Sequence, residues 1–344
     1  MNRPNLLGSI AVGILAVAAL TSGVAAECSR EKLIAAADVY LAAQKAGKLD
    51  GLQKLFAADK FAYQENNKVI DITKSILTQP LDIEYNRTTA DTVGCATYTQ
   101  LAALTPKPYV IGTQLHYTPD MSAITMIDSI VATTGALFFN ASATLGYWRK
   151  VGNACSLPPC CILALVPNLP FGDFSYLATA NMGNLRVTRL TSVKQDWKLL
   201  EAAARPSRDA LQKAVDGYLD LWGGPNATSA MSHLPFGNPC ERVEGSRYVT
   251  PCSDVPRPAR NGGKANGMRR SVVDEVMGSA QVLCSFSAVG NIPDSHEIRI
   301  ENGKIRYVNT ITLCAIDDGP DWGPTCLAAR ASRPKAASPR LLDA

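Results

Sequence analysis

Two neighbouring segments near the end of the chain could place polar side chains on an apolar surface. Successive side chains of a β-strand point to opposite faces. In "HEIRIE" His296 therefore shares a face with two isoleucines, and in "IRYVNTITL" Tyr307 and Asn309 share a face with aliphatic residues. A few polar groups within an apolar lining are typical of a small-molecule pocket.

These three residue types are suited to proton transfer. The pKa of an unperturbed histidine lies near neutrality, so His296 could act as acid or base. Tyr307 and Asn309 could bind an oxygen that gains charge. We therefore predict a catalytic group for dehydration, isomerisation or pericyclic ring closure, reactions that need neither metal nor redox cofactor. The alternative is that the three side chains bond to one another or to the backbone and only join the core.

Three charged residues are candidate ligand contacts. Arg242 and Glu244 alternate with Val243 in "CERVEG", so they share one strand face and could orient an anionic or carbonyl group at a pocket mouth. An ion-pair network that stabilises a long loop is the alternative. Asp128 occupies the place in the first half of the chain that Asn309 has in the second. A buried aspartate needs a partner or a raised pKa.

Several function classes lack their motifs. The sequence has no GxSxG, no HExxH and no phosphate-binding glycine loop. The formal charge of +4 is small and unclustered, and no basic stripe carries interleaved aromatic residues. We therefore expect no nucleic-acid partner, no metal and no cofactor. The expected partner is a small apolar molecule.

A repeat shows which elements must position these residues. "SREKLIAAADVYL" from Ser29 is repeated as "SRDALQKAVDGYL" from Ser207, and both have the apolar spacing of an amphipathic helix. "AITMIDSIVAT" and "KIRYVNTITLC" match as alternating strands. The repeat predicts two tandem α+β units, each a curved antiparallel sheet packed with helices to form a cone with an open mouth. A second short helix is expected near residues 49–56, and a long loop over residues 223–268.

The chain begins with the pattern of a secretory signal peptide. In residues 1–26, Arg3 precedes an apolar run that ends in small residues. An uncleaved membrane anchor is the alternative, but the apolar run is shorter than a bilayer span. We expect a secreted, extracellular protein without membrane contact after cleavage.

The remaining chain divides into units and irregular segments. Residues 27–150 and 195–316 are the predicted tandem domains. Residues 151–194 show no assignable periodicity and no counterpart elsewhere, and we interpret them as a retained intron, with an apolar lid as the alternative. Residues 317–344 are rich in Pro, Ala and Arg and are expected to be an unstructured tail.

Cysteine and asparagine motifs fit an oxidising compartment. Of the ten cysteines, six remain when those of the insert and tail are set aside, an even set that suits disulfides better than zinc. The expected pairs are Cys28 with Cys95, Cys240 with Cys252, and Cys284 with Cys314. Glycosylation sequons occur at Asn86, Asn140 and Asn226.

Longer stretches resemble a known family. "LFAADKFAYQENNKVID", "PYVIGTQLHY", "LPFGNPCERVEG", "RRSVVDEVMG" and "PDSHEIRIENGKIRYVNTIT" look like a secreted fungal family of unknown function with tandem SnoaL-like domains. These domains belong to the nuclear-transport-factor-2-like superfamily, which implies α+β cones. Distant relatives resemble fungal hetero-Diels–Alderases of secondary metabolism. The resemblance implies a cofactor-free dehydratase, isomerase or cyclase; alternatively, it implies a non-catalytic secreted binding protein or effector.

Overall fold

The computed structural model of the chain describes residues 28–149, 176–181, 184–189, 195–224, 227–255 and 264–313. The predicted signal peptide and tail lie outside these residues. The first unit contains α1 (Arg30–Ala46), α2 (Asp50–Gln53), β1 (Ala62–Glu65), β2 (Lys68–Val69), β3 (Asp82–Asp91), β4 (Ala96–Thr105), β5 (Tyr109–Tyr117), β6 (Ile124–Thr133) and α3 (Ala141–Trp148). The second contains α4 (Arg208–Trp222), α5 (Ala227–His233), β9 (Phe236–Glu244), β10 (Arg247–Val249), β11 (Gly267–Asp274), β12 (Ser279–Phe286), β13 (Ile292–Glu301) and β14 (Lys304–Thr312).

The two units have the same sheet topology. One six-stranded sheet has the order β2-β1-β6-β5-β4-β3 and the other the order β10-β9-β14-β13-β12-β11. Within each sheet every neighbouring pair is antiparallel except β1–β6 and β9–β14, which are parallel. The prediction of two tandem α+β units is therefore confirmed, and the matched strand segments are β6 and β14.

The repeated helices are built alike. Ser29 and Ser207 are their N-caps, and each hydroxyl accepts a hydrogen bond from the first turn of its helix, from Lys32 N and Ala210 N. The apolar stripe of each helix is buried against its own sheet. Tyr40 of α1 and Tyr218 of α4 are fully buried at matching positions. The sequence periodicity thus identifies the face that each helix turns to the sheet.

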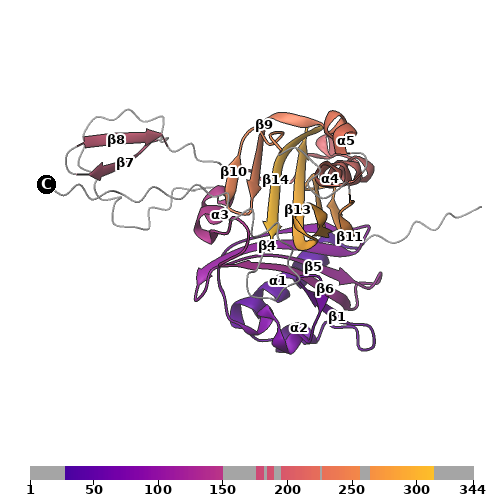
Figure 1. Cartoon of the computed structure of the whole chain (residues 1–344). Coiled ribbons are helices and arrows are strands. Elements are labelled where there is room, and N and C mark those ends of the chain that lie inside the picture. Colours follow the sequence, from indigo (N-terminus) through magenta and orange to yellow (C-terminus); the bar gives the residue numbers. More distant parts are fainter. Residues whose placement is uncertain are drawn as a thin grey trace, which may run out of the picture.

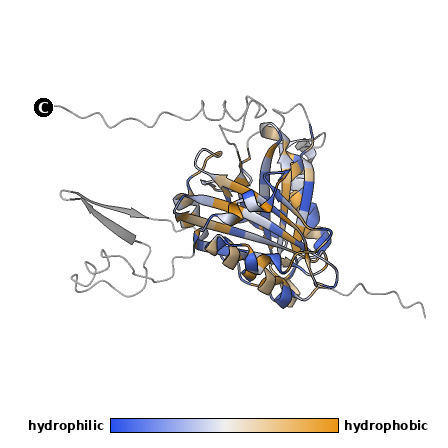
Figure 2. Ribbon diagram, turned by 90° about the horizontal axis from the view of Figure 1, so that it is seen from below, coloured by the Kyte–Doolittle hydropathy of each residue, from blue (hydrophilic) through white to orange (hydrophobic). Residues whose placement is uncertain are grey.

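The sheets pack against each other, and the long helices lie on the outside (Figure 1). A core cluster between them contains residues of both units, including Tyr98, Ile130, Val243, Leu283 and Ile311. Each sheet is therefore covered on both faces, by helices on one side and by the other unit on the opposite side. Figure 2 shows hydrophobic and hydrophilic residues mixed along the strands, because many buried strand residues are polar.

Two ion pairs cross between the units in a reciprocal way. Arg30 at the start of α1 contacts Asp274 at the end of β11, with Nη1 and Oδ1 2.7 Å apart. Arg208 at the start of α4 contacts Asp91 at the end of β3, with Nη1 and Oδ1 2.6 Å apart. Each unit thus supplies the arginine of one pair and the aspartate of the other.

The same two aspartates bind the backbone of the opposite unit. Asp274 Oδ2 accepts a hydrogen bond from Ala90 N at 2.8 Å, and Asp91 Oδ2 accepts one from Val273 N at 3.0 Å. Both carboxylates are about 1% exposed. The interface therefore has an approximate twofold symmetry in its polar contacts as well as in its topology.

A third ion pair lies at the interface. Arg87 donates to both oxygens of Glu297, at 2.7 and 2.6 Å, and the Glu297 carboxylate also accepts from Ser279 Oγ at 3.0 Å. The guanidinium lies 3.5 Å from the centroid of the Trp197 ring. The two hydrogen bonds of this buried pair and its additional partners offset the free-energy cost of removing both charges from water. The pair therefore holds the two units in one relative position.

Two predictions about irregular segments need correction. The expected loop over residues 223–268 contains α5, β9 and β10, because the Pro and Gly residues there bound a strand that pairs with β14. Within the expected insert, β7 (Tyr176–Asn181) and β8 (Asn184–Arg189) form a hairpin that belongs to neither six-stranded sheet.

Two of the three expected disulfides are present. Cys28 is bonded to Cys95 in the first unit, and Cys240 to Cys252 in the second. The first ties the entry to α1 to the β3–β4 turn, and the second ties β9 to the segment after β10.

The third expected disulfide is not formed. Cys284 is a buried free thiol on β12, and its expected partner Cys314 lies outside the described residues. The side chain of Cys284 is part of the apolar core between α4 and the second sheet. Burial raises the pKa of this thiol well above its ordinary value.

Candidate functional site

One face of the second sheet gathers an acid, a base and an arginine beneath α4. Thr310 pairs with His296 on one side and with Glu244 on the other, so these three side chains share a face. Residues two positions along a strand point the same way, which adds Asp294 and Arg242. Three predicted site residues, His296, Arg242 and Glu244, are therefore brought together.

The other two predicted catalytic residues lie on the opposite face. Asn309 pairs with Glu297, and Tyr307 pairs with Arg299. Glu297 and Arg299 lie one and three positions after His296, so they and their partners point to the other face of the sheet. The prediction that His296, Tyr307 and Asn309 meet is wrong. Since helices cover one face of this sheet and the first unit covers the other, apolar neighbours occur on both faces and do not identify the cone interior.

Tyr307 and Asn309 instead hold the segment that leads into the second unit. Gln195 and Asn309 exchange two amide hydrogen bonds, both 2.9 Å. Asp196 N donates to Tyr307 Oη at 3.1 Å. These contacts fix residues 195–200 across the face of the sheet opposite α4, so both side chains have a structural role.

Arg242 is held within the interior of the second unit. It is 2% exposed, and its Nη2 donates to the carbonyl oxygen of Asp254 at 2.8 Å. Its Nη1 lies 3.5 Å from Tyr218 Oη, and its guanidinium stands 5.5 Å from the Trp222 ring. Glu244, whose side chain is 18% exposed, lies 3.6 Å from Nη2 at the edge of this interior.

Aromatic rings line the interior around His296. Its ring centroid lies 5.1 Å from Phe286 and 5.6 Å from Tyr218, and the Trp222 ring lies 5.8 Å from that of Phe286. His296 is 2% exposed. The imidazole is therefore buried among aromatic rings, an environment that disfavours charge.

The acid, the base and the arginine each have one polar atom with no hydrogen-bond partner among the described residues: Asp294 Oδ2, His296 Nδ1 and Arg242 Nε. Trp222 Nε1 in the same interior also lacks one. Asp294 Oδ1 is satisfied, because it accepts from Ser295 N at 2.8 Å and from Thr312 Oγ1 at 3.0 Å. Its Oδ2 lies 3.6 Å from His296 Nδ1. Buried polar groups are nearly always satisfied, so this concentration needs an explanation.

Burial shifts both members of this pair toward their neutral forms. Desolvation raises the pKa of Asp294 well above its ordinary value, although the Thr312 hydrogen bond opposes the shift. Desolvation, followed by the positive charges of Arg242 and Arg269, lowers the pKa of His296 to about 3. Since Oδ1 already accepts two hydrogen bonds, a proton on Asp294 belongs on Oδ2, facing the imidazole. A neutral acid thus stands beside a neutral base.

Asp128 does not enter the interior of the first unit. It is fully buried between the units, where Gln64 Nε2 donates to its Oδ1 at 3.1 Å and Arg270 forms an ion pair with its Oδ2. Arg270 also donates to Asn67 Oδ1 at 2.8 Å. The predicted ligand contact is therefore an interface residue, because β6 turns this face to the second unit.

Some polar groups of the first unit's interior satisfy one another. Tyr40 Oη and Thr113 Oγ1 are 2.8 Å apart, and Thr113 Oγ1 and Ser129 Oγ are 2.9 Å apart. Tyr63 Oη donates to Glu65 at 2.7 Å. Gln44 Oε1, Thr97 Oγ1 and Tyr117 Oη have no partner among the described residues. None of the three belongs to a carboxyl group or an imidazole, so proton transfer is better supported in the second unit than in the first.

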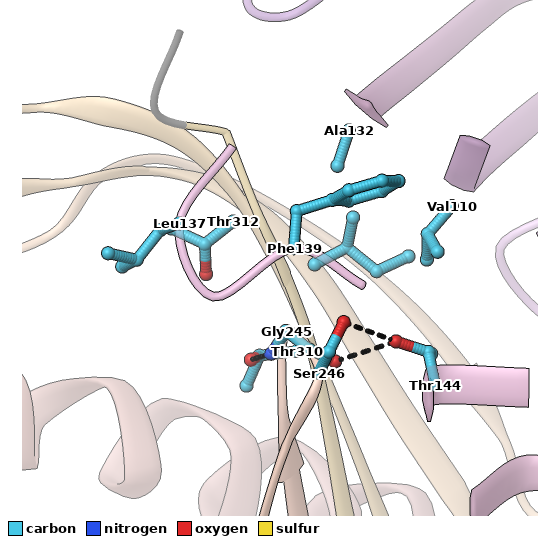
Figure 3. Close-up of a pocket in the computed structure, with 10 residues that line it drawn as sticks. Val110, Ala132, Leu137, Phe139, Thr144, Gly245, Ser246, Thr310 and Thr312 are labelled. Carbon is cyan, nitrogen blue, oxygen red and sulfur yellow. Dashed lines mark hydrogen bonds between the residues drawn. The ribbon is translucent and has the colours of Figure 1, made fainter. Parts of the chain in front are cut away.

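His296 lines neither of two pockets that described residues form. The expected cavity around His296 is not one of them. A groove of about 410 Å³ lies between α4 and α5, with His233 in its lining. A cavity of about 10 Å³, near the volume needed for one water, lies between the units beside Thr310 and Thr312 (Figure 3).

Sequence reasoning missed Asp294 and Tyr218. Asp294 stands two residues before His296 in "PDSHE", so strand alternation placed it on the same face. Tyr218 lies in the repeated helix at the position of Tyr40, and that match indicated an inward-facing side chain. Both signals were present in the patterns that predicted the fold.

Two features are absent from the described part of the chain. It contains no group of three or more His, Cys, Asp or Glu side chains that could hold a metal ion. None of its helices is both long and apolar enough to cross a membrane.

Residues 204–312, most of the second unit, match a family described as a domain of unknown function (DUF8021). No curated protein matches the chain. Similar solved structures include PrhC from Penicillium brasilianum NBRC 6234, with 13% identity and a TM-score of 0.24 over 30% of this chain and 82% of that one.

Two bacterial proteins of unknown function are also similar. One, from Burkholderia xenovorans LB400, is described as NTF-2 like and has 13% identity and a TM-score of 0.25 over 36% of this chain and 97% of its own. The other, from Shewanella baltica OS155, is described as ntf2-like and has 8% identity and a TM-score of 0.24 over 30% and 94%. Such low scores add nothing about the chemistry of the second unit.

Proposed function

We propose that the second unit binds a small, largely apolar molecule and transfers a proton on it. Asp294 and His296 serve as acid and base, and Arg242 stabilises the oxygen that gains charge. The observation that carries this proposal is the meeting of three unpartnered polar atoms in one aromatic-walled interior. A ligand oxygen would supply the partner that Arg242 Nε lacks.

The pair can run a balanced proton transfer. Asp294 Oδ2–H gives its proton to a carbonyl or hydroxyl oxygen of the ligand, and neutral His296 takes a proton from carbon. In an isomerisation the proton on His296 returns to Asp294 across the 3.6 Å that separate Nδ1 and Oδ2. In a dehydration the protonated hydroxyl leaves as water. No electrons are exchanged, so neither reaction needs a redox cofactor.

Ring closure is a third reaction of this class. The sequence resemblance to fungal hetero-Diels–Alderases favours it, and Arg242 beside a carbonyl oxygen would polarise a reacting heterodiene. Binding without conversion, as in a secreted carrier or effector, is the competing function. Product formation separates the two.

The same proposal places the protein outside the cell. The two disulfides within the described residues suit an oxidising compartment. Asn86 and Asn140 are exposed, as glycosylated asparagines must be; Asn226 lies outside the described residues. The predicted signal peptide provides the route.

The decisive experiment compares metabolites. Deleting the gene in its source organism should make a precursor accumulate, and the purified secreted protein should convert that precursor. Asp294→Asn and His296→Gln should each lower the conversion rate on the order of 10²-fold or more, the scale of a positioned acid or base.

Tyr307→Phe is the matched control, because it removes a hydroxyl from the opposite face of the same sheet. It should leave the rate unchanged. Loss of conversion in Tyr307→Phe with activity retained in His296→Gln would refute the assignment. If the precursor binds but no product forms, and His296→Gln weakens binding by about 1 kcal/mol, the protein is a carrier.

A further inference from the structure

The small cavity between the units is lined from both sides. From the first unit it takes Val110, Ala132, Leu137, Phe139 and Thr144, and from the second Gly245, Ser246, Thr310, Ile311 and Thr312 (Figure 3). Leu137 and Phe139 belong to segment 136–140, which is part of the connection from β6 to α3. This segment therefore lies where the two units share a wall.

The cavity adjoins the acid and base of the second unit. Thr312 Oγ1 donates to Asp294 Oδ1 at 3.0 Å. Thr310 pairs directly with His296 across β13 and β14. Both threonines line the cavity and share the face of the proposed acid and base. Thr312 therefore lines the cavity and is hydrogen-bonded to the proposed acid.

Leu137 is part of the first unit in sequence, but its side chain packs in the core of the second unit. Its side chain packs against the core cluster between α4 and the second sheet, which includes Val308 and Cys284. The other partly buried hydrophobic residues of that cluster all come from the second unit. Leu137 is therefore a side chain that one unit contributes to the interior of the other.

The segment that carries Leu137 is fixed to the β9–β10 turn. Ser246 N donates to the carbonyl oxygen of Phe138 at 3.0 Å, and Asn140 N donates to Ser246 Oγ at 2.5 Å. Thr144 Oγ1 lies 2.7 Å from Ser246 Oγ and donates to the carbonyl oxygen of Gly245 at 3.2 Å (Figure 3). These bonds hold the segment at the end of the cone.

Gly245 permits this approach. Its φ of 57° lies in the left-handed region, and a Cβ at this position would stand 2.8 Å from the carbonyl oxygen of Leu137. Only glycine allows both the turn and the contact. The backbone of the second unit is therefore adapted to the first-unit segment above it.

We propose that segment 136–140 of the first unit is the closing wall of the second unit's site, and that Leu137 limits the size of the molecule that reaches Asp294 and His296. This inference rests on the proposed function for its ligand. Its structural content, that Leu137 seals the interior, can be tested without any ligand. The first unit then acts as a specificity element for a site it does not itself contain.

Cys284 provides the test, because its thiol lies in the same interior. It pairs with Asp294 across β12 and β13, so both side chains share a face. In the intact protein and in Leu137→Ala, the rate at which N-ethylmaleimide labels Cys284 is measured by mass spectrometry of its peptide. Following one peptide keeps other thiols out of the measurement.

Leu137→Ala should raise the labelling rate at least about 10-fold, because truncating a packed leucine lowers the cost of local opening. Leu41→Ala, the same truncation at a partly buried site on the first unit's own core, should not. Leu137→Met should behave like the intact protein. Equal rates in the intact protein and Leu137→Ala, or an equal rise in Leu41→Ala, would overturn the inference.

Two aryl ketones of different size separate this inference from the proposed function. Acetophenone and 2-acetonaphthone are compared by saturation-transfer nuclear magnetic resonance. The intact protein should bind the smaller ketone only, and Leu137→Ala should bind both. If labelling rises but neither ketone binds to any form, the role of Leu137 in closing the interior is supported and the proposed function loses support. If Leu137→Ala leaves the size limit unchanged, Leu137 does not set specificity.

Discussion

The buried pair Asp294 and His296 should give the protein a pH dependence that appears only when one member is removed. In the folded state both groups are held neutral, so the pair carries one proton, on the carboxyl. In the unfolded chain at pH 5 the carboxyl is ionised and the imidazole is protonated, which is again one proton. Stability depends on pH only where folded and unfolded states bind different numbers of protons. The intact pair therefore contributes no slope.

Asp294→Asn leaves His296 alone. Its pKa is about 3 in the folded protein and 6.5 in the unfolded chain, so between these values only the unfolded chain takes up a proton. The free energy of unfolding should then fall by about 1.4 kcal/mol for each pH unit of acidification. From pH 6 to pH 4.5 the loss should be about 2 kcal/mol.

His296→Phe leaves Asp294 alone and keeps a planar ring between its aromatic neighbours. The pKa of Asp294 is raised in the folded protein from an ordinary value of 3.8. Above 3.8 the folded state therefore holds a proton that the unfolded chain has lost, so acidification stabilises the fold. The slope should have the opposite sign between pH 3.8 and the raised pKa of Asp294, where it can reach at most about 1.4 kcal/mol per pH unit.

The assay is urea denaturation followed by tryptophan fluorescence at four pH values from 4.5 to 6. The intact protein supplies the background slope of all other groups, and the double variant should reproduce it. Divergent slopes of the single variants, one above and one below this background, are the expected result. If all four forms run parallel, neither group is buried as a neutral species, and the acid and base roles lose their basis.

Four other predictions follow from the fold. Asp274→Ala should cost about 3–5 kcal/mol of stability, more than Arg30→Met, because it also leaves a buried backbone N–H of the first unit without its acceptor; equal losses in urea denaturation would contradict this. Gly245→Ala should lower stability by about 1–3 kcal/mol, and a melting temperature equal to that of the intact protein would refute the tight approach. Expression through a eukaryotic secretory pathway should attach a glycan at Asn140 that Asn140→Gln removes, as read by intact mass; no mass difference would refute it. Sequencing the transcript should show residues 151–194 spliced out, whereas peptides from this range in the secreted protein would overturn the intron proposal.

The sequence predicted the fold through its repeat. One helix pattern and one strand pattern, each written twice in the same order, required two units of equal topology. Ser29 and Ser207 cap the matched helices, and β6 and β14 hold equivalent places in their sheets. Local periodicity was sufficient because each helix buries its apolar stripe against its own sheet.

The site was predicted only in part, because strand alternation gives relative and not absolute faces. His296 and Asn309 were each assigned to an apolar face within their own strands, yet the two strands turn those faces in opposite directions. An apolar face marks a cone interior only when the other face meets water. Here the second face is covered by the first unit and by residues 195–200, which no local pattern indicated.

The charged residues were misjudged for a related reason. Arg242 and Glu244 were correctly placed on one face of a strand. Asp128 was expected in a cone but lies at the interface with Arg270, a contact between residues far apart in sequence. Long-range ion pairs depend on how whole units dock, and docking leaves no periodicity in either partner.

The reciprocal contacts of Arg30 with Asp274 and of Arg208 with Asp91 are those of two equal partners, but a single chain carries both. Tethering replaces a bimolecular encounter by an intramolecular one at high effective concentration, so assembly no longer depends on dilution. It also ensures that the first unit pairs with the second, whereas two separately encoded units could form homodimers as well as heterodimers. Because neither unit has to pair with a copy of itself, the two can diverge in sequence. One unit can then keep polar groups in its interior while the other serves only to cover and stabilise it.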